Sequence, residues 1–339
     1  MSKSTVSGNA GVVHRRKSPV KKQAVKPIPG GATPTNKFPD GHGSVINKVR
    51  VQMIYWGTAW ATNPTPSQAD ITAAVKKILA GPYMTDLIQY RGIDYGTFQG
   101  ETSVTAVVGS GATQSPANPP NSFTDAQVFQ LITNLVAAGT VPSPDAVPQI
   151  LYCVVVPVGV QSSNSAAIGE HTYDTNSAYT NKFHFAWVEN DGTLDYVTEI
   201  FSHELAESCT DPEGDAFTGV AGTCSGTGWC EIGDVCEGVT GLLNGISVQA
   251  YWSDQAGACV IPQIHRPNLS RLIDEPELTA QWYVKVWLLI HGPDPAPDLA
   301  VSATARLTAT TRAIAALSRC LNNPQAERAI ITALKPFSL

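Results

Sequence analysis

Hydrophobic and polar positions along the first 210 residues follow the periods of strands and helices in turn. Residues 45–57 alternate and are rich in β-branched side chains, which predicts a strand. The next apolar positions recur every three or four residues, which predicts a helix with one apolar face: Ile71, Val75, Ile78 and Leu79. Thr65 and Gln68 match a capping box at its start, and Gly81-Pro82 ends it.

A second strand and a second helix repeat this pattern. Residues 102–110 are predicted as the strand. Thr124 and Gln127 form a second capping box, ahead of residues that share one apolar helix face. Residues 149–159 are a continuous apolar run, which is typical of a central strand that is buried on both faces.

The last elements of this part are a strand and a long helix. Residues 183–189 alternate, as in a more exposed strand, and a helix follows over about 194–210, ending before Pro212. The order strand, helix, strand, helix, strand, strand, helix predicts an α/β fold with a mixed sheet and flanking helices.

The chain divides by composition into three parts. Residues 1–44 are rich in Pro, Gly, Lys and Ser and are predicted to be a disordered basic arm. Residues 45–262 hold the α/β domain, and 263–339 are predicted to be a C-terminal α-helical extension that offers a surface for self-association. No segment approaches the roughly 20 apolar residues of a membrane span, so none is expected.

Charge is distributed unevenly. The 339 residues carry a formal net charge of −6, but ten of the 22 basic residues lie in residues 1–50 with a single acid, Asp40. The rest of the chain therefore has 12 basic and 27 acidic residues. An acidic body disfavours nucleic acid as the main partner.

The chemistry of the sequence centres on "SHELAES", in the helix predicted over 194–210. His203 and Glu207 are one helical turn apart and share a face, as do the two histidines of the HExxH motif of zinc peptidases. Imidazole and carboxylate are both ligands of zinc. Glu204 stands where those enzymes have the general base.

A further protein ligand is needed, and the sequence leaves its identity open. Three carboxylates are favoured as this ligand: Asp211 at the end of the helix, and Glu231 and Asp234 in the glycine-rich loop that follows. The histidines that remain as candidates are His171, His184 and His265. A shell rich in carboxylates also suits manganese or calcium in place of zinc.

Two plainer interpretations stand beside a catalytic metal. The His and Glu residues could be the solvated face of an amphipathic helix, or the acidic loop residues could hold a structural calcium ion. Other nucleophiles are disfavoured, because the chain has neither a GxSxG elbow nor a P-loop. Cys209 is expected to be packed or bridged, not reactive.

Five of the seven cysteines lie between residues 209 and 259, in a region rich in glycine. Such clustering favours one or two disulfides and an oxidising, extracellular destination. The N-terminus has no continuous apolar segment of the kind that secretory signals carry, so the compartment stays open.

Three stretches carry a resemblance to a known family: "SHELAESCTDP", "GWCEIGDVC" and "VQAYWSDQAGACV". In this order they resemble an uncharacterised microbial family that shares a HELAE–TDP helix and an EIGD–C loop. "VQMIYWGTAW" also looks like that group and, more distantly, like the plant EXORDIUM (phosphate-induced) proteins. The resemblance covers about residues 45–262.

The resemblance implies a zincin-like domain that is often secreted. Carried over by position, it implies a site made of His203, Glu204, Glu207, Asp211, Glu231 and Asp234. It also implies a disulfide between Cys236 and Cys259. The function expected from motif and resemblance together is a zinc-dependent hydrolase, specifically a metallopeptidase acting on a peptide or another small substrate. The alternative is a non-catalytic binding or structural module that holds a structural ion.

Overall fold

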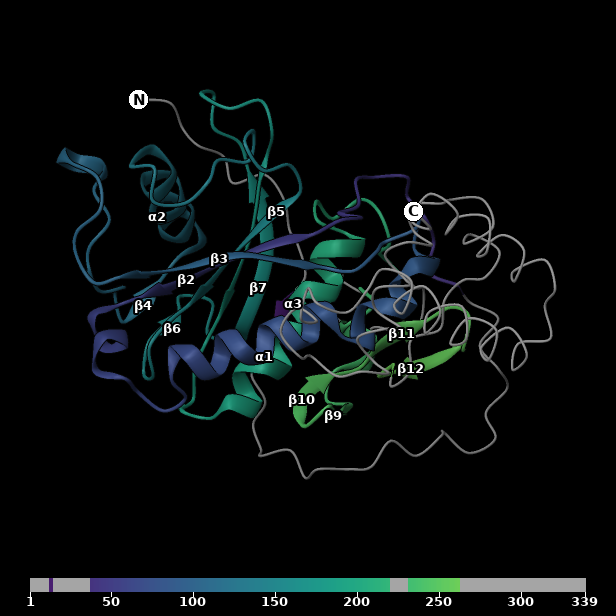
Figure 1. The fold of residues 1–339 in the computed structure, drawn as a ribbon. Coiled ribbons are helices and arrows are strands. Elements are labelled where there is room, and N and C mark those ends of the chain that lie inside the picture. The colour runs from purple at the N-terminus through teal and green to yellow at the C-terminus, as the bar shows by residue number, and fades with distance from the viewer. Residues whose placement is uncertain (1–11, 15–36, 220–230, 263–339) are drawn as a thin grey trace, which may run out of the picture. The chain divides into compact units, whose positions relative to one another are not determined.

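The computed structural model describes residues 12–14, 37–219 and 231–262. They form an α/β fold with a mixed sheet and flanking helices, as the order of predicted elements indicated (Figure 1). The helical extension predicted for residues 263–339 lies outside the described residues. Within the described part of the chain, no helix is both long and apolar enough to cross a membrane.

The main sheet has six strands in the order β1-β7-β8-β5-β2-β3. Four of them, β3, β2, β5 and β8, run parallel to one another, whereas β7 is antiparallel to both β8 and β1. The strands are β1 (Val12–His14), β2 (Arg50–Trp56), β3 (Thr97–Val104), β5 (Ile150–Val155), β7 (Ala167–Asp174) and β8 (Phe183–Val188).

Helices cover both faces of this sheet and create two hydrophobic cores. Alternate residues of β5 separate them: Leu151 and Cys153 face one core, and Tyr152 and Val154 face the other. The first core is shared with α1 (Gln68–Ala80) and α3 (Leu194–Thr210), and the second with α2 (Asp125–Ala137). The site described below lies on the α3 side.

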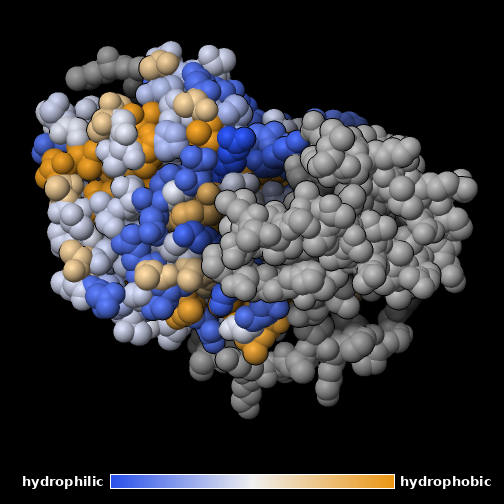
Figure 2. All heavy atoms as spheres, viewed as in Figure 1, coloured by the Kyte–Doolittle hydropathy of each residue, from blue (hydrophilic) through white to orange (hydrophobic). Residues whose placement is uncertain are grey.

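Shorter elements complete the described part. Three two-stranded sheets are formed by β4 (Ser122–Phe123) with β6 (Gln161–Ser162), β9 (Thr240–Leu243) with β10 (Ile246–Gln249), and β11 (Tyr251–Ser253) with β12 (Ala258–Val260). The 3₁₀ helices are η1 (Thr58–Thr62), η2 (Pro82–Gln89), η3 (Gly111–Thr113) and η4 (Asp234–Cys236). On the surface in view, hydrophobic residues gather in small groups between hydrophilic ones (Figure 2).

The helix starts test the capping predictions directly. At α2 the predicted box is confirmed, because Thr124 and Gln127 exchange both hydrogen bonds. At α1 the prediction was two residues early: Ser67 is the N-cap and Asp70 closes the box. The pairs Thr65–Gln68 and Ser67–Asp70 both have the spacing of a capping box. Only the second places a carboxylate in the first turn, where it also interacts favourably with the helix dipole.

Three strand predictions need correction. The second strand covers Thr97–Val104, not residues 102–110. β8 is almost entirely buried, not more exposed, because it lies between β7 and β5 with both faces covered. β7 was not predicted at all, although it supplies a residue of the site. In addition, Val12–His14 forms a strand within the stretch that composition favoured as disordered.

Cys236 and Cys259 form the disulfide that the resemblance implied, across 23 residues of sequence. Cys209 is buried, packed and free, while Cys224, Cys230 and Cys320 lie outside the described residues. The disulfide fixes η4, and therefore the backbone of Asp234, to strand β12.

Removing this disulfide should lower stability without changing the fold. Closing a loop of this length restricts the unfolded chain, so the double substitution Cys236→Ala/Cys259→Ala is expected to cost about 3 kcal/mol of unfolding free energy. Urea unfolding of the variant beside the wild type, both without reductant, measures the difference. An unchanged midpoint would mean that the bridge does not constrain the unfolded chain.

Candidate metal centre

The site is built on α3, whose local sequence explains its bounds. The Thr193 side chain caps its start by accepting from the backbone N–H of Tyr196, and Pro212 follows its C-cap residue, Asp211. From Val197 onward nearly every residue is buried, and the buried residues include a histidine and two glutamates. Burying ionisable groups costs free energy, so their presence on this helix indicates a functional site and not only packing against the core.

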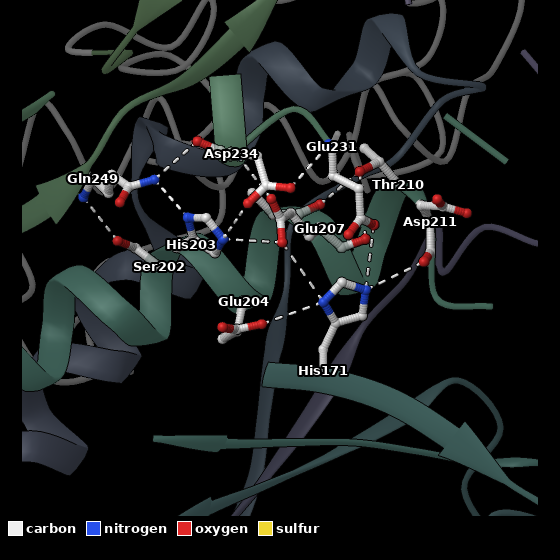
Figure 3. A network of polar contacts seen from close by, with 12 residues as sticks. His171, Ser202, His203, Glu204, Glu207, Thr210, Asp211, Glu231, Asp234 and Gln249 are labelled. Carbon is white, nitrogen blue, oxygen red and sulfur yellow. Dashed lines mark hydrogen bonds and ion pairs between the residues drawn. The ribbon is translucent and has the colours of Figure 1, made fainter. Parts of the chain in front are cut away.

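The first cluster joins α3 to Asp234, the first residue of η4. His203 Nε2 lies 3.0 Å from Glu207 Oε2 and 3.7 Å from Asp234 Oδ1. The other oxygen of Glu207, Oε1, accepts from the backbone N–H of Asp234 at 2.9 Å. Glu207 is therefore held by the start of η4 through one oxygen and turns the other toward the imidazole (Figure 3).

The opposite edge of the His203 ring is held by Gln249 on β10. The amide nitrogen of Gln249 lies 2.6 Å from His203 Nδ1 and also donates to the carbonyl of Gly233 at 3.1 Å. The backbone N–H of Gln249 donates to Ser202 Oγ. Because this nitrogen donates to the carbonyl of Gly233, the donor end of the amide faces Nδ1, and the contact fixes the ring with Nε2 directed at the carboxylates.

The second cluster joins α3 to β7. His171 Nδ1 lies 3.2 Å from Glu204 Oε2 and 3.7 Å from Glu207 Oε2. His171 Nε2 lies 3.2 Å from the backbone carbonyl of Asp211 and 3.5 Å from Glu231 Oε1. Glu207 is thus common to both clusters, and each cluster contains one imidazole (Figure 3).

Several buried polar atoms in these clusters have no hydrogen-bond partner among the described residues. They are His203 Nε2, Glu204 Oε1, Glu207 Oε2, Asp211 Oδ2 and both carboxylate oxygens of Glu231. Buried polar groups in folded proteins are almost always paired. A concentration of unpaired carboxylate oxygens beside imidazole nitrogens indicates a place for a cation.

Burial and mutual repulsion set the protonation of the carboxylates. Burial raises the pKa of Glu204 and of Glu231 well above the usual range, and it raises that of Asp234 to about 7. Burial also acts to raise the pKa of Glu207, but the neighbouring His203 more than offsets this and leaves it lowered. Glu207 is therefore the carboxylate that keeps its charge most readily.

The pKa values of the two histidines are raised as well, but by the neighbouring carboxylates and not by burial. Burial acts to lower the pKa of His203, but the carboxylates around it, Glu207 first, raise it to about 9. The pKa of His171 is raised as well, because Glu204 and Glu207 outweigh the effect of burial. Without an ion, protons compensate the negative charge. A metal ion would replace them, since its ligands must be deprotonated.

The residues fit a metal ion. Two groups bring three ligand atoms each within 4.8 Å of one another: His203, Glu207 and Asp234, and His171, Glu204 and Glu207. One imidazole with two carboxylates is a donor set that zinc and manganese accept. Apart from Asp234, whose side chain is 15% exposed, these side chains are at most 1% exposed.

The structure shows which of the candidate ligands from the sequence lie close together. Asp234, Glu231 and His171 lie in the clusters, and Glu204 faces His171. Asp211 lies beside them, but its Oδ1 accepts from the N–H of Ala216 and its backbone carbonyl faces His171. His184 lies elsewhere, and His265 is outside the described residues. The sequence offered no signal for Gln249.

His184 belongs to a separate charged cluster with Glu213 and Lys182. The hydrogen bonds that Glu213 accepts from His184, at 3.3 Å, and from Lys182 lower its pKa to about 2. Because the ordinary pKa of a glutamate is 4.5 and that of Glu213 in the folded protein is lower, these contacts stabilise the fold above about pH 4.5. The benefit disappears as pH falls through about 2.

Glu213→Gln should therefore show a pH-dependent loss of stability. At pH 7 we expect a loss of about 1 kcal/mol, the size typical of partly exposed ion pairs. The difference from the wild type should shrink as the pH falls toward 2. Chemical unfolding at a series of pH values measures it. A difference that is constant with pH would assign the loss to packing, not to charge.

Comparison of the chain with protein-family models, with curated proteins and with solved structures finds no match. The functional argument therefore rests on the residues of the site.

Proposed function

We propose that this protein is a metal-dependent hydrolase of the zincin type, with peptides as its substrate class and zinc as its ion. The observation that carries the proposal is the cluster of His203, Glu207 and Asp234. Its two α3 residues are one turn apart, and their facing atoms, Nε2 and Oε2, are 3.0 Å apart and buried without a hydrogen-bond partner among the described residues. This is the arrangement that the HExxH motif produces, with a carboxylate in place of the second imidazole.

Each residue then has a distinct task. His203 Nε2, Glu207 Oε2 and Asp234 Oδ1 would hold the ion, while Gln249 orients the His203 ring. A bound zinc ion would supply Lewis acidity and lower the pKa of a water molecule to about 7. Glu204 is the base that takes up the proton, and its contact with His171 at 3.2 Å directs Oε2 toward the cluster.

The order and packing of the elements favour a zincin-like frame. α3 follows directly on β8, a strand of a mixed sheet, and packs against β7, which supplies His171. The active-site helix of zincins likewise follows a strand of a mixed sheet. The resemblance of residues 45–262 to the HELAE–TDP family points the same way.

A second candidate function is a non-catalytic module that holds a structural ion. The observation that favours it is the abundance of carboxylates around the two imidazoles, all nearly inaccessible except Asp234. Anionic ligands reduce the Lewis acidity of an ion and raise the pKa of its water, so such a shell can bind metal without activating water. This module would show a chelator-dependent melting temperature and no hydrolysis.

Glu204→Gln separates the two functions. It keeps the shape of the side chain but removes the base, so hydrolysis should fall by about 10²–10⁴-fold while metal at His203 is retained. The measurement is cleavage of a diverse peptide library, read by mass spectrometry, with metal content determined on the same samples. Glu213→Gln, a carboxamide change outside the site, is the matched control and should cleave like the wild type.

Two results would count against the hydrolase. Full activity in Glu204→Gln would remove the base assignment. A wild-type protein that holds its metal and cleaves no member of the library would favour the structural module.

A further inference from the structure

We infer that a second cation site lies beside the first, formed by His171, Glu204 and Glu207, so that Glu207 links two ions. Its residues come from β7 and α3. His171 Nδ1 lies 3.2 Å from Glu204 Oε2 and 3.7 Å from Glu207 Oε2. The inference concerns binding and holds whether or not the protein catalyses hydrolysis.

The surroundings of His171 decide which of its nitrogens can bind a cation. Nε2 faces the backbone carbonyl of Asp211 at 3.2 Å and Glu231 Oε1 at 3.5 Å. A backbone carbonyl only accepts hydrogen bonds, so Nε2 must carry a proton to be paired. In the neutral ring Nδ1 then presents a lone pair, and the atoms nearest to it are two carboxylate oxygens. A cation at this point satisfies all three atoms.

The contact of His171 Nε2 with a backbone carbonyl is also typical of histidines that bind metal through their other nitrogen. Histidine ligands commonly donate their second ring N–H to a carbonyl or carboxylate, which fixes both tautomer and ring orientation. Asp211, whose carbonyl accepts here, is the C-cap of α3, and its own backbone N–H donates to the backbone carbonyl of Glu207 at 2.7 Å. The helix end therefore aligns His171 with the carboxylates of the same helix.

One ion does not account for the buried charge. Five carboxylates gather around two imidazoles: Glu204, Glu207, Asp211, Glu231 and Asp234. An ion among His203, Glu207 and Asp234 leaves Glu204, Glu231 and Asp211 without a cation. Each of these three has at least one buried oxygen with no partner among the described residues. A second divalent ion at His171 Nδ1 compensates Glu204 directly, at a point where ligand atoms already converge, whereas Glu231 and Asp211 lie at the other edge of the ring.

The donor set indicates the class of ion. One imidazole nitrogen and two carboxylate oxygens suit zinc or manganese, and two such ions sharing a carboxylate typically lie about 3.5–4 Å apart. With the second ion bound, Glu204 Oε2 is a ligand and is not free to take up a proton. Glu204 can therefore act as the proposed base only when the protein holds an ion at His203 and none at His171.

Metal stoichiometry tests the second site. The full chain, stripped of metal, is titrated with zinc chloride and followed by isothermal titration calorimetry. We expect two equivalents in the wild type and one in His171→Ala. His184→Ala, which removes an imidazole on β8 outside the clusters, is the matched control and should keep two. Circular dichroism establishes that each variant is folded.

A spectroscopic measurement on the wild type covers the case in which His171→Ala does not fold. Loading with manganese should give the electron paramagnetic resonance spectrum of a spin-coupled pair, because one carboxylate bridges the two ions. A single equivalent of zinc, or an uncoupled manganese spectrum at saturation, would overturn the second site and leave the first intact. No binding at all would overturn both sites, and with them the proposed hydrolase.

Discussion

Glu207→Gln is expected to reduce metal affinity by at least about 10³-fold and to abolish any metal-dependent stabilisation. Glu207 Oε2 lies 3.0 Å from His203 Nε2 and 3.7 Å from His171 Nδ1, so it is the one ligand common to both clusters. Glutamine preserves the Oε1 contact with the backbone N–H of Asp234 but places an NH₂ group or a neutral oxygen where the ion needs a charged oxygen. With free ion at about 1,000 times the wild-type dissociation constant, the lost stabilisation is about 4 kcal/mol.

The effect of Glu207→Gln on stability should change sign when metal is withheld. Without an ion, the cluster is a set of buried carboxylates that repel one another, so neutralising one of them should leave the protein as stable as the wild type or more so. Thermal unfolding of both proteins, with zinc and with a chelator, measures this. Equal destabilisation under both conditions would show that Glu207 is needed for packing and not for metal.

Gly233→Ala is expected to lower metal affinity by about 10–100-fold, although residue 233 supplies no ligand. A Cβ at this position would lie 2.7 Å from Glu207 Oε1 and 2.9 Å from His203 Nδ1. Both side chains would have to move, which would disturb the contacts with Asp234 and Gln249 that orient them. The φ of Gly233 is −78°, which any residue adopts, so the expected effect is steric and not a matter of backbone strain.

Gly100→Ala on β3 is the control for this substitution. Its Cβ would meet the Gln52 side chain at 3.1 Å, which is a flexible amide far from the clusters in sequence and on another strand. It should bind zinc with wild-type affinity, measured for both variants by competition with a chromogenic chelator. Wild-type affinity in Gly233→Ala as well would mean that the clusters are loose enough to absorb a methyl group.

The features that could be predicted from the sequence are local in the chain. The α2 capping box and the bounds of α3 depend on residues three or four positions apart, and the pairing of His203 with Glu207 depends on one helical turn. The Ser67 box was missed because two overlapping matches compete within a few residues. The Cys236–Cys259 bridge came from the family resemblance and not from spacing.

The features that could not be predicted depend on contacts between distant segments. His171 was one of three histidines that could not be ranked, because β7 was not recognised and its antiparallel place beside β8 is a tertiary property. The burial of β8 has the same origin, since alternation within a strand does not show what covers its second face. Gln249 contacts His203 across 46 positions, and an isolated glutamine in a strand carries no chemical signal.

Metal content is the most direct test of the central claim that His203 and Glu207 hold an ion. The full chain is purified without chelators or an affinity tag that binds metal, exposed to zinc, dialysed, and measured by inductively coupled plasma mass spectrometry beside His203→Ala. We predict that zinc is present in the wild type and that His203→Ala holds one equivalent fewer. A wild type without zinc, or a variant with the same metal content as the wild type, would contradict the metal centre.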